Sequence, residues 1–157
     1  MDTGDYAAQL GALGYPKFSY LRARASLVPD PAKLLFDALN EADLDSRIAE
    51  GLPWLVATHA DMDWDWLVCN AELHSRQNRL GFIVTLATEL ARAGNDRGQA
   101  TKLEQQLERL EEIRFSGEDT FCHDSMTTIE RSWLREHSSP TAAHWNILSD
   151  LKPEIIG

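Results

Sequence analysis

The sequence predicts an all-α protein that folds as a single domain over residues 1–157. Three observations predict this class. Apolar residues recur every three or four positions in one segment after another, which is the spacing of amphipathic helices. Segments that alternate apolar and polar residues, as strands do, are almost absent. Glycine and proline are few and fall mainly between the periodic segments, where they end helices. We therefore expect six to eight short helices.

Residues 76–93 are predicted to form a central, buried helix. Its apolar positions cover nearly every side, and only a narrow polar stripe remains. A helix with so broad an apolar surface is usually covered by neighbours on several sides. Ser75 is the expected N-cap, and Gly94 is expected to end the helix in a left-handed conformation. The charged residues in this stretch and its polar entry, Arg76–Arg79, argue against a membrane span.

The chain before this helix contains several helix signals. Residues 4–13 are periodic, although residues 1–29 as a whole read as a loosely packed N-terminal segment. Asp30-Pro31 is a helix start, since a capping carboxylate precedes a proline at the first helical position. Asp43 is predicted to cap the next helix. Pro53 lies inside that helix and is expected to kink or split it near residues 50–51, because proline lacks an N–H group.

Further helices are predicted after residue 61. Residues 61–75 and 97–115 are amphipathic, and Thr127 with Glu130 forms a capping-box pattern. Ser139-Pro140 begins a last helix that is expected to include Leu148, before a tail at residues 152–157. Such helices pack as an irregular bundle or as stacked antiparallel pairs. Consecutive pairs suggest a HEAT-like stack by architectural analogy only, since no repeat motif is present.

Composition restricts the classes of partner. The formal net charge is −10 at pH 7, which disfavours nucleic acid and anionic membranes because both attract a positive surface. The N-terminus lacks the basic region and apolar core of a secretory signal. Two cysteines far apart in the sequence form no disulfide framework, so a reducing cytoplasm is the expected location.

An acidic surface is the first candidate site. The helix at 97–115 carries glutamates along its outer side, and an acidic loop follows it. Exposed tryptophan favours interfaces. Of the five tryptophans, Trp54 and Trp66 lie at positions where a second face of the helix is expected to be exposed. The predicted partner-binding residues are Glu104, Glu108, Glu111, Glu112, Glu118, Asp119, Trp54 and Trp66.

Two other classes remain open. Cys122-His123 suggests a small metal-binding protein or enzyme, although adjacent side chains usually diverge and no ligand spacing such as CxxC occurs. Lys17, Arg22 and Arg24 form the one basic, aromatic-bearing patch, which suggests a nucleic-acid accessory protein.

The aspartates of residues 61–72 resemble an EF-hand loop, but Trp66 replaces its glycine, so helix capping is the better explanation. No nucleophile elbow, Walker loop, HExxH or dinucleotide-binding motif is present in the sequence.

The leading hypothesis is therefore a non-enzymatic, cytoplasmic interaction or regulatory protein. It would present an acidic helical surface to a basic protein partner, as an antitoxin or immunity-type neutraliser does, or as a small regulatory subunit does. The sequence predicts no cofactor, no metal and no membrane contact. The oligomeric state and the identity of the partner are left open.

Overall fold

The computed structural model describes residues 1–24 and 28–152, and helices account for most of them, which confirms the predicted all-α class. In chain order the elements are α1 (Thr3–Ala12), the 3₁₀ helix η1 (Pro16–Arg24), α2 (Pro31–Leu39), α3 (Ser46–Thr58), α4 (Trp64–Leu73), α5 (Gln77–Ala93), α6 (Arg97–Ile113), β1 (Asp119–Thr120), α7 (Thr128–Glu136), α8 (Pro140–His144) and β2 (Ile147–Leu148). Of the predicted tail, residues 153–157 lie outside the described residues.

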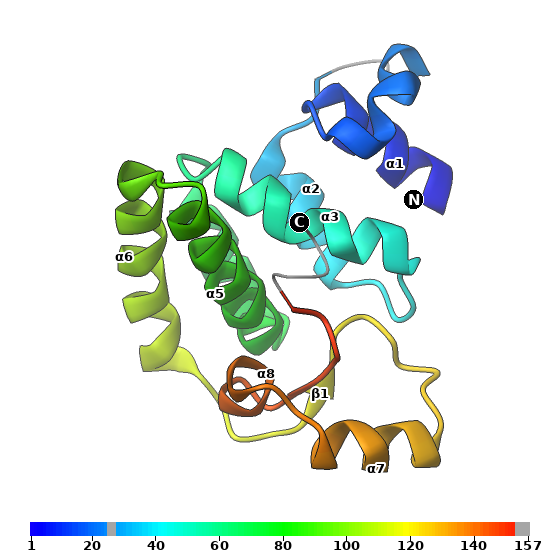
Figure 1. The fold of residues 1–157 in the computed structure, drawn as a ribbon, viewed down its shortest axis with the longest axis vertical. Coiled ribbons are helices and arrows are strands. Elements are labelled where there is room, and N and C mark those ends of the chain that lie inside the picture. Colours follow the sequence, from blue (N-terminus) through cyan, green and yellow to red (C-terminus); the bar gives the residue numbers. More distant parts are fainter. Residues whose placement is uncertain (25–27, 153–157) are drawn as a thin grey trace.

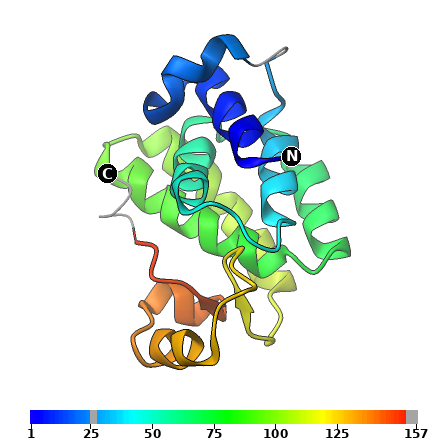
Figure 2. The ribbon, with the colours of Figure 1, turned by 90° about the vertical axis from the view of Figure 1, so that its right-hand side faces the viewer.

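Helix α5 lies in the middle of the fold, as predicted. Figure 1 shows α3 and α6 on either side of it, with α1 at one end of the molecule and α7 at the other. Figure 2, turned by a quarter, shows the same arrangement, with the first helices (blue) at the top, α5 (green) in the middle and α7 (orange) at the bottom. Phe82, Ile83 and Val84 of α5 have no exposed surface. Within residues 1–24 and 28–152, no helix combines the length and apolar character that a bilayer crossing requires.

The first helices belong to the main hydrophobic core. Tyr6 and Leu10 of α1 are buried there, together with Tyr15 and Phe18. The Tyr6 hydroxyl donates a hydrogen bond of 2.8 Å to the Glu41 carboxylate. The N-terminal segment that was expected to pack loosely spans residues 1–29, and of these, residues 25–27 lie outside the described residues.

Three predicted helix starts are confirmed by their capping bonds. The Asp30 carboxylate accepts from the backbone N–H of Ala32, and the Ser139 hydroxyl accepts from that of Ala142. The Thr127 hydroxyl accepts from the backbone N–H of Glu130. These bonds satisfy N–H groups that the first turn of a helix leaves without partners.

Helix α5 spans Gln77–Ala93, close to the predicted 76–93, but the capping residues expected at its two ends are each displaced by one position. Ser75 has φ 57° and Arg76 occupies the N-cap position without a side-chain bond. Ser75 still completes the turn that ends α4, since its backbone N–H donates to the carbonyl of Glu72. In this left-handed conformation it cannot also adopt the extended conformation of an N-cap. At the other end Gly94 has φ −83°, and Asn95 takes the left-handed conformation at φ 60°. Asparagine tolerates that conformation better than other non-glycine residues.

The predicted N-cap of α3 is wrong, and of the two alternatives expected at Pro53, a kink or a split, the split does not occur. Asp45, not Asp43, caps this helix by accepting from the backbone N–H of Arg47. Pro53 does not split the helix, which continues from Ser46 to Thr58. Pro53 is buried, and the burial of the helix's apolar face in the core offsets the hydrogen bond that proline removes.

The C-terminal region is less helical than predicted. Helix α8 ends at His144, Asn146 is left-handed at φ 56°, and Leu148 lies in β2. The left-handed residue ends the helix, and β2 then pairs in parallel with β1, Asp119 opposite Ile147. Strands of two residues carry no periodicity, so the sequence did not indicate them.

Close packing at Gly81 gives a stability prediction. A Cβ atom at this position would lie 2.3 Å from Cζ3 of Trp145, whose side chain is buried. We expect Gly81→Ala to destabilise the protein by about 2 kcal/mol, because the indole must move within a filled core. Urea denaturation followed by tryptophan fluorescence measures the change.

The matched control is Gly98→Ala in the exposed first part of α6, where the nearest other atom is 3.8 Å away. It should stabilise the protein by about 0.5 kcal/mol by removing a helical glycine. Equal effects of the two substitutions would contradict the packing at Gly81.

Candidate functional site

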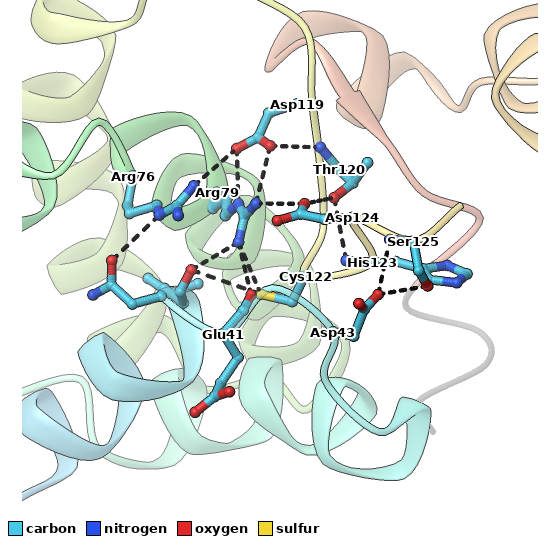
Figure 3. Close-up of polar contacts among 12 residues, drawn as sticks. Glu41, Asp43, Arg76, Arg79, Asp119, Thr120, Cys122, His123, Asp124 and Ser125 are labelled. Atoms are coloured by element: carbon cyan, nitrogen blue, oxygen red, sulfur yellow. Dashed lines mark hydrogen bonds and ion pairs between the residues drawn. The ribbon is translucent and has the colours of Figure 1, made fainter. Parts of the chain in front are cut away.

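Arg79 connects the C-terminal part of the protein to its helical core. It is 1 % exposed at the start of α5. Its Nε and Nη2 groups donate to the Asp119 carboxylate at 2.7 and 3.0 Å, and Nη2 also donates to Asp124 at 3.1 Å. Its Nη1 group donates to the carbonyls of Leu39 and Glu41. Figure 3 shows these bonds converging on one guanidinium group.

The Arg79 network satisfies all the hydrogen-bonding capacity of the side chain. A guanidinium has five N–H groups, and each finds an oxygen in this network. Burial disfavours the charge, but the bonds to Asp119 and the nearby Asp124 outweigh burial and raise the pKa of Arg79. The carbonyl of Leu39 is at the C-terminus of α2, where a cation is favourable. The Arg79 network therefore has a structural role.

The neighbouring polar residues have the same role. The Asn78 amide, which has no exposed surface, donates to the carbonyls of Phe115 and Trp145 at 2.8 and 2.9 Å. The Gln77 amide donates to the carbonyl of Ile113. The polar entry of α5 thus binds the ends of α6 and α8 to the core.

Residues 119–126 are fixed against the connection between α2 and α3. The backbone N–H of Leu44 donates to the carbonyl of Cys122 at 2.8 Å, and the backbone N–H of Asp124 donates to the carbonyl of Ala42 at 2.7 Å. Asp43 accepts from both the backbone and the hydroxyl of Ser125 (Figure 3), and these bonds lower the pKa of Asp43. The start of α7 is thereby held at a fixed place.

Cys122 and His123 do not form a nucleophile and base pair. The Cys122 side chain is 1 % exposed and points to the carbonyl of Ala38, whereas His123 is exposed. Burial raises the pKa of the Cys122 thiol to about 11 despite the opposing effect of Arg79. A thiol that remains protonated is a poor nucleophile and a poor metal ligand.

An open groove of about 800 Å³ runs beside α7, and we call it the α7 groove. It lies between α7, the first part of α3, residues 121–126 and residues 148–151. Its apolar lining includes Leu44, Phe121, Met126, Leu134, Leu148 and Leu151. Met126, Leu134 and Leu148 also form a small hydrophobic cluster separate from the main core. Helix α7 therefore packs against the protein through one side only.

Two large apolar side chains of α7 remain exposed at the groove. Ile129 is 83 % exposed and Trp133, one helical turn later, is 53 % exposed. The Trp133 ring stacks on His137 with centroids 4.3 Å apart and an angle of 17° between planes. The stacking restricts the indole before any partner binds, which reduces the entropy that binding must overcome.

The rim of the α7 groove is acidic. Glu50 of α3, Glu130 of α7 and Asp150 after β2 line it from three separate segments of the chain. No lysine or arginine is among the described residues that line it, and no described cation forms an ion pair with these three carboxylates. The groove is apolar within and negatively charged at its edge.

The predicted acidic surface is divided by the structure. Four of its six carboxylates are paired within the protein: Glu104 with Arg92, Glu111 with His144, Glu118 with Arg135, and Asp119 with Arg79. Glu108 and Glu112 of α6 are exposed and have no hydrogen-bonded or ion-pair partner within the described chain. The sequence could not indicate these pairings, since all four partners are more than ten residues away and on other elements.

The two predicted tryptophans lie apart from the α7 groove. Trp54 is partly buried and packs on Tyr15 with ring centroids 5.1 Å apart. Trp66 is 37 % exposed and contacts Phe36 edge-on. Neither lines the groove, so the predicted set does not form one surface.

The other charged patches are also placed by the structure. Asp63 caps α4 by accepting from the backbone N–H of Trp66, and Asp65 pairs with Arg109. No cluster of three or more potential metal ligands occurs in residues 1–24 and 28–152. Lys17 and Arg22 are exposed on η1, at the end of the molecule far from α7 (Figure 1), and the Arg24 side chain lies outside the description.

The sequence did not indicate the α7 groove as a site, although one signal for it was present. Residues 129–134 carry three large apolar side chains, Ile129, Trp133 and Leu134, on a helix of only nine residues. Only Leu134 is buried. Comparisons of the chain with protein-family models, with curated proteins and with solved structures gave no match, so the site is interpreted from its own chemistry.

The Arg79 network gives a second stability prediction. We expect Arg79→Lys to destabilise the protein by about 3 kcal/mol, because one ammonium cannot reach all five oxygens and leaves buried groups unpaired. Urea denaturation provides the measurement.

Arg76→Lys is the control, since Arg76 is 25 % exposed and its closest contact with Asp119 is 3.8 Å. Its loss should stay below about 1 kcal/mol. Similar losses for the two variants would show that the Arg79 network does not hold the C-terminal region.

Proposed function

We propose that this protein is a non-enzymatic interaction protein that binds a basic protein partner at the α7 groove. The exposed apolar surface of α7 beside an apolar channel supports this proposal most directly. Monomeric proteins rarely leave large apolar side chains clustered in the open, and such clusters mark interaction sites. Tryptophan is also enriched among the residues that dominate binding energy.

The acidic rim supports a basic partner. Three carboxylates line the apolar channel and form no ion pair with any cation of the described residues. Opposite charges around an apolar centre guide association and orient the partner. The net charge of −10 acts in the same direction at longer range. A neutraliser of a basic toxin and a small regulatory subunit would both use such a site.

The proposed location is the cytoplasm. Cys69 and Cys122 are both free thiols in the structure, and Cys69 is exposed. Free exposed thiols suit a reducing compartment.

The acidic face of α6 remains a prediction, now restricted to Glu108 and Glu112. Because the other predicted carboxylates have partners inside the protein, a basic ligand would have to displace arginines or a histidine to reach them. Exposed ion pairs contribute little to stability, but they reduce the negative charge that is available to a ligand.

A double substitution tests the α7 groove as the partner site. We expect Ile129→Ser with Trp133→Ala to lower the amount of a specific partner captured from the source cells by at least about tenfold, since removal of a central tryptophan anchor costs about 2 kcal/mol or more. Both side chains are largely exposed, so the thermal unfolding midpoint should be unchanged. Quantitative mass spectrometry of the captured proteins measures the effect.

Two variants serve as controls. Leu73→Ser removes an equally apolar side chain, 73 % exposed on α4 and outside the groove, and should leave capture unchanged. Glu108→Lys with Glu112→Lys reverses the unpaired charges of α6. Loss of the partner in the α6 variant, with full capture by the groove variant, would place the site on α6 and contradict the proposal.

A further inference from the structure

We infer that the α7 groove takes one class of occupant, a cationic amphipathic helix with apolar side chains along one face and lysine or arginine on both flanks. This inference rests on the proposed function and specifies its partner. It follows from the arrangement of apolar and charged groups around the groove.

The charged groups that face the groove come from every element that forms it. Glu50 projects from α3, Glu130 from α7 and Asp150 from the segment after β2, while His123 is the sole basic residue among the described lining residues. The negative charges therefore flank the apolar channel on more than one side. An occupant with cations on one edge only would leave a carboxylate facing apolar surface.

The apolar channel is suited to large side chains. Its volume of about 800 Å³ lies in the upper part of the range for ligand sites. Phe121, Leu148 and Leu151 provide buried apolar lining, and Met126 is a flexible side chain that adapts to different occupants. Ile129 and Trp133 extend this lining to the open edge.

The arrangement favours a helical occupant. An amphipathic helix places its apolar residues in one stripe and its charged residues on the flanks of that stripe, which is the common way a helix binds in an apolar groove. An extended segment points alternate side chains in opposite directions. Half of its side chains would then leave the apolar channel.

The same charges exclude a second copy related by two-fold symmetry. In such a pair each surface patch meets its own copy, so the carboxylates of both rims would come together. Like charges at an interface are strongly unfavourable. Nucleic acid and acidic peptides are disfavoured for the same reason.

Three synthetic peptides of about 18 residues, or five helical turns, test the inference. The first is an amphipathic helix of leucine and lysine, the second has glutamate in place of lysine, and the third contains the first peptide's residues in shuffled order. Fluorescence anisotropy at about 0.15 M ionic strength measures binding. We expect the first peptide to bind at least about tenfold more tightly than either of the others.

Charge variants show whether the rim is responsible. Glu130→Lys with Asp150→Lys should weaken the leucine–lysine peptide by at least about tenfold and strengthen the leucine–glutamate peptide. Both residues are exposed. Glu108→Lys with Glu112→Lys changes the net charge by the same amount on α6 and should leave the order of affinities unchanged. Trp133→Ala should weaken the first peptide, whereas Leu73→Ser should not.

Several outcomes would overturn the inference. Equal binding of the ordered and shuffled peptides, or equal effects of the groove and α6 charge variants, would show that overall charge alone attracts the peptide. A marked increase in affinity when residues 153–157 are deleted would assign the groove to the chain itself. If partner capture depends on Trp133 but the protein binds the three peptides equally, the proposed function stands. The inference that the occupant is a cationic helix is then wrong.

Discussion

The ion pair between the buried Arg79 and the partly buried Asp119 is the interaction on which the arrangement of this protein depends. Arg79 belongs to the first turn of the central helix α5, and Asp119 begins the C-terminal quarter of the chain. The same guanidinium binds the carbonyls at the end of α2. Three segments that are far apart in sequence are therefore held at one point. Loss of one partner of a buried arginine leaves an uncompensated charge and strongly destabilises the protein. The positions of these three segments therefore depend on one another.

The α7 groove follows from that constraint. Asp119 fixes the start of residues 119–126, and the backbone bonds of Leu44 and Asp124 hold this stretch against the α2–α3 connection. Helix α7 begins immediately after it and packs mainly through Leu134. Arg135 then ties α7 to Glu118 with two bonds of 2.8 Å. One wall of the groove is thus held by polar contacts at its ends, and its apolar side remains open.

Much of the fold was accessible from the sequence. The central helix and the starts at Asp30, Thr127 and Ser139 depend on local patterns, and each is confirmed. Errors arose where the outcome depends on distant partners or on single residues in tight turns. Asp43 binds Ser125, which is 82 residues away, instead of capping a helix. The groove could not be predicted because its lining joins residues 44–50, 121–134 and 148–151. The pairing of Glu104, Glu111 and Glu118 was hidden for the same reason.

Chemical-shift mapping of the ¹⁵N-labelled protein with the leucine–lysine peptide tests the central claim most directly. The account predicts that the largest shifts fall on residues 44–50, 121–134 and 148–151, together with the indole N–H of Trp133. Residues of α6 should shift little, although Glu108 and Glu112 are exposed and acidic. Largest shifts on α6, or small shifts spread evenly over the acidic surface, would contradict a specific site beside α7.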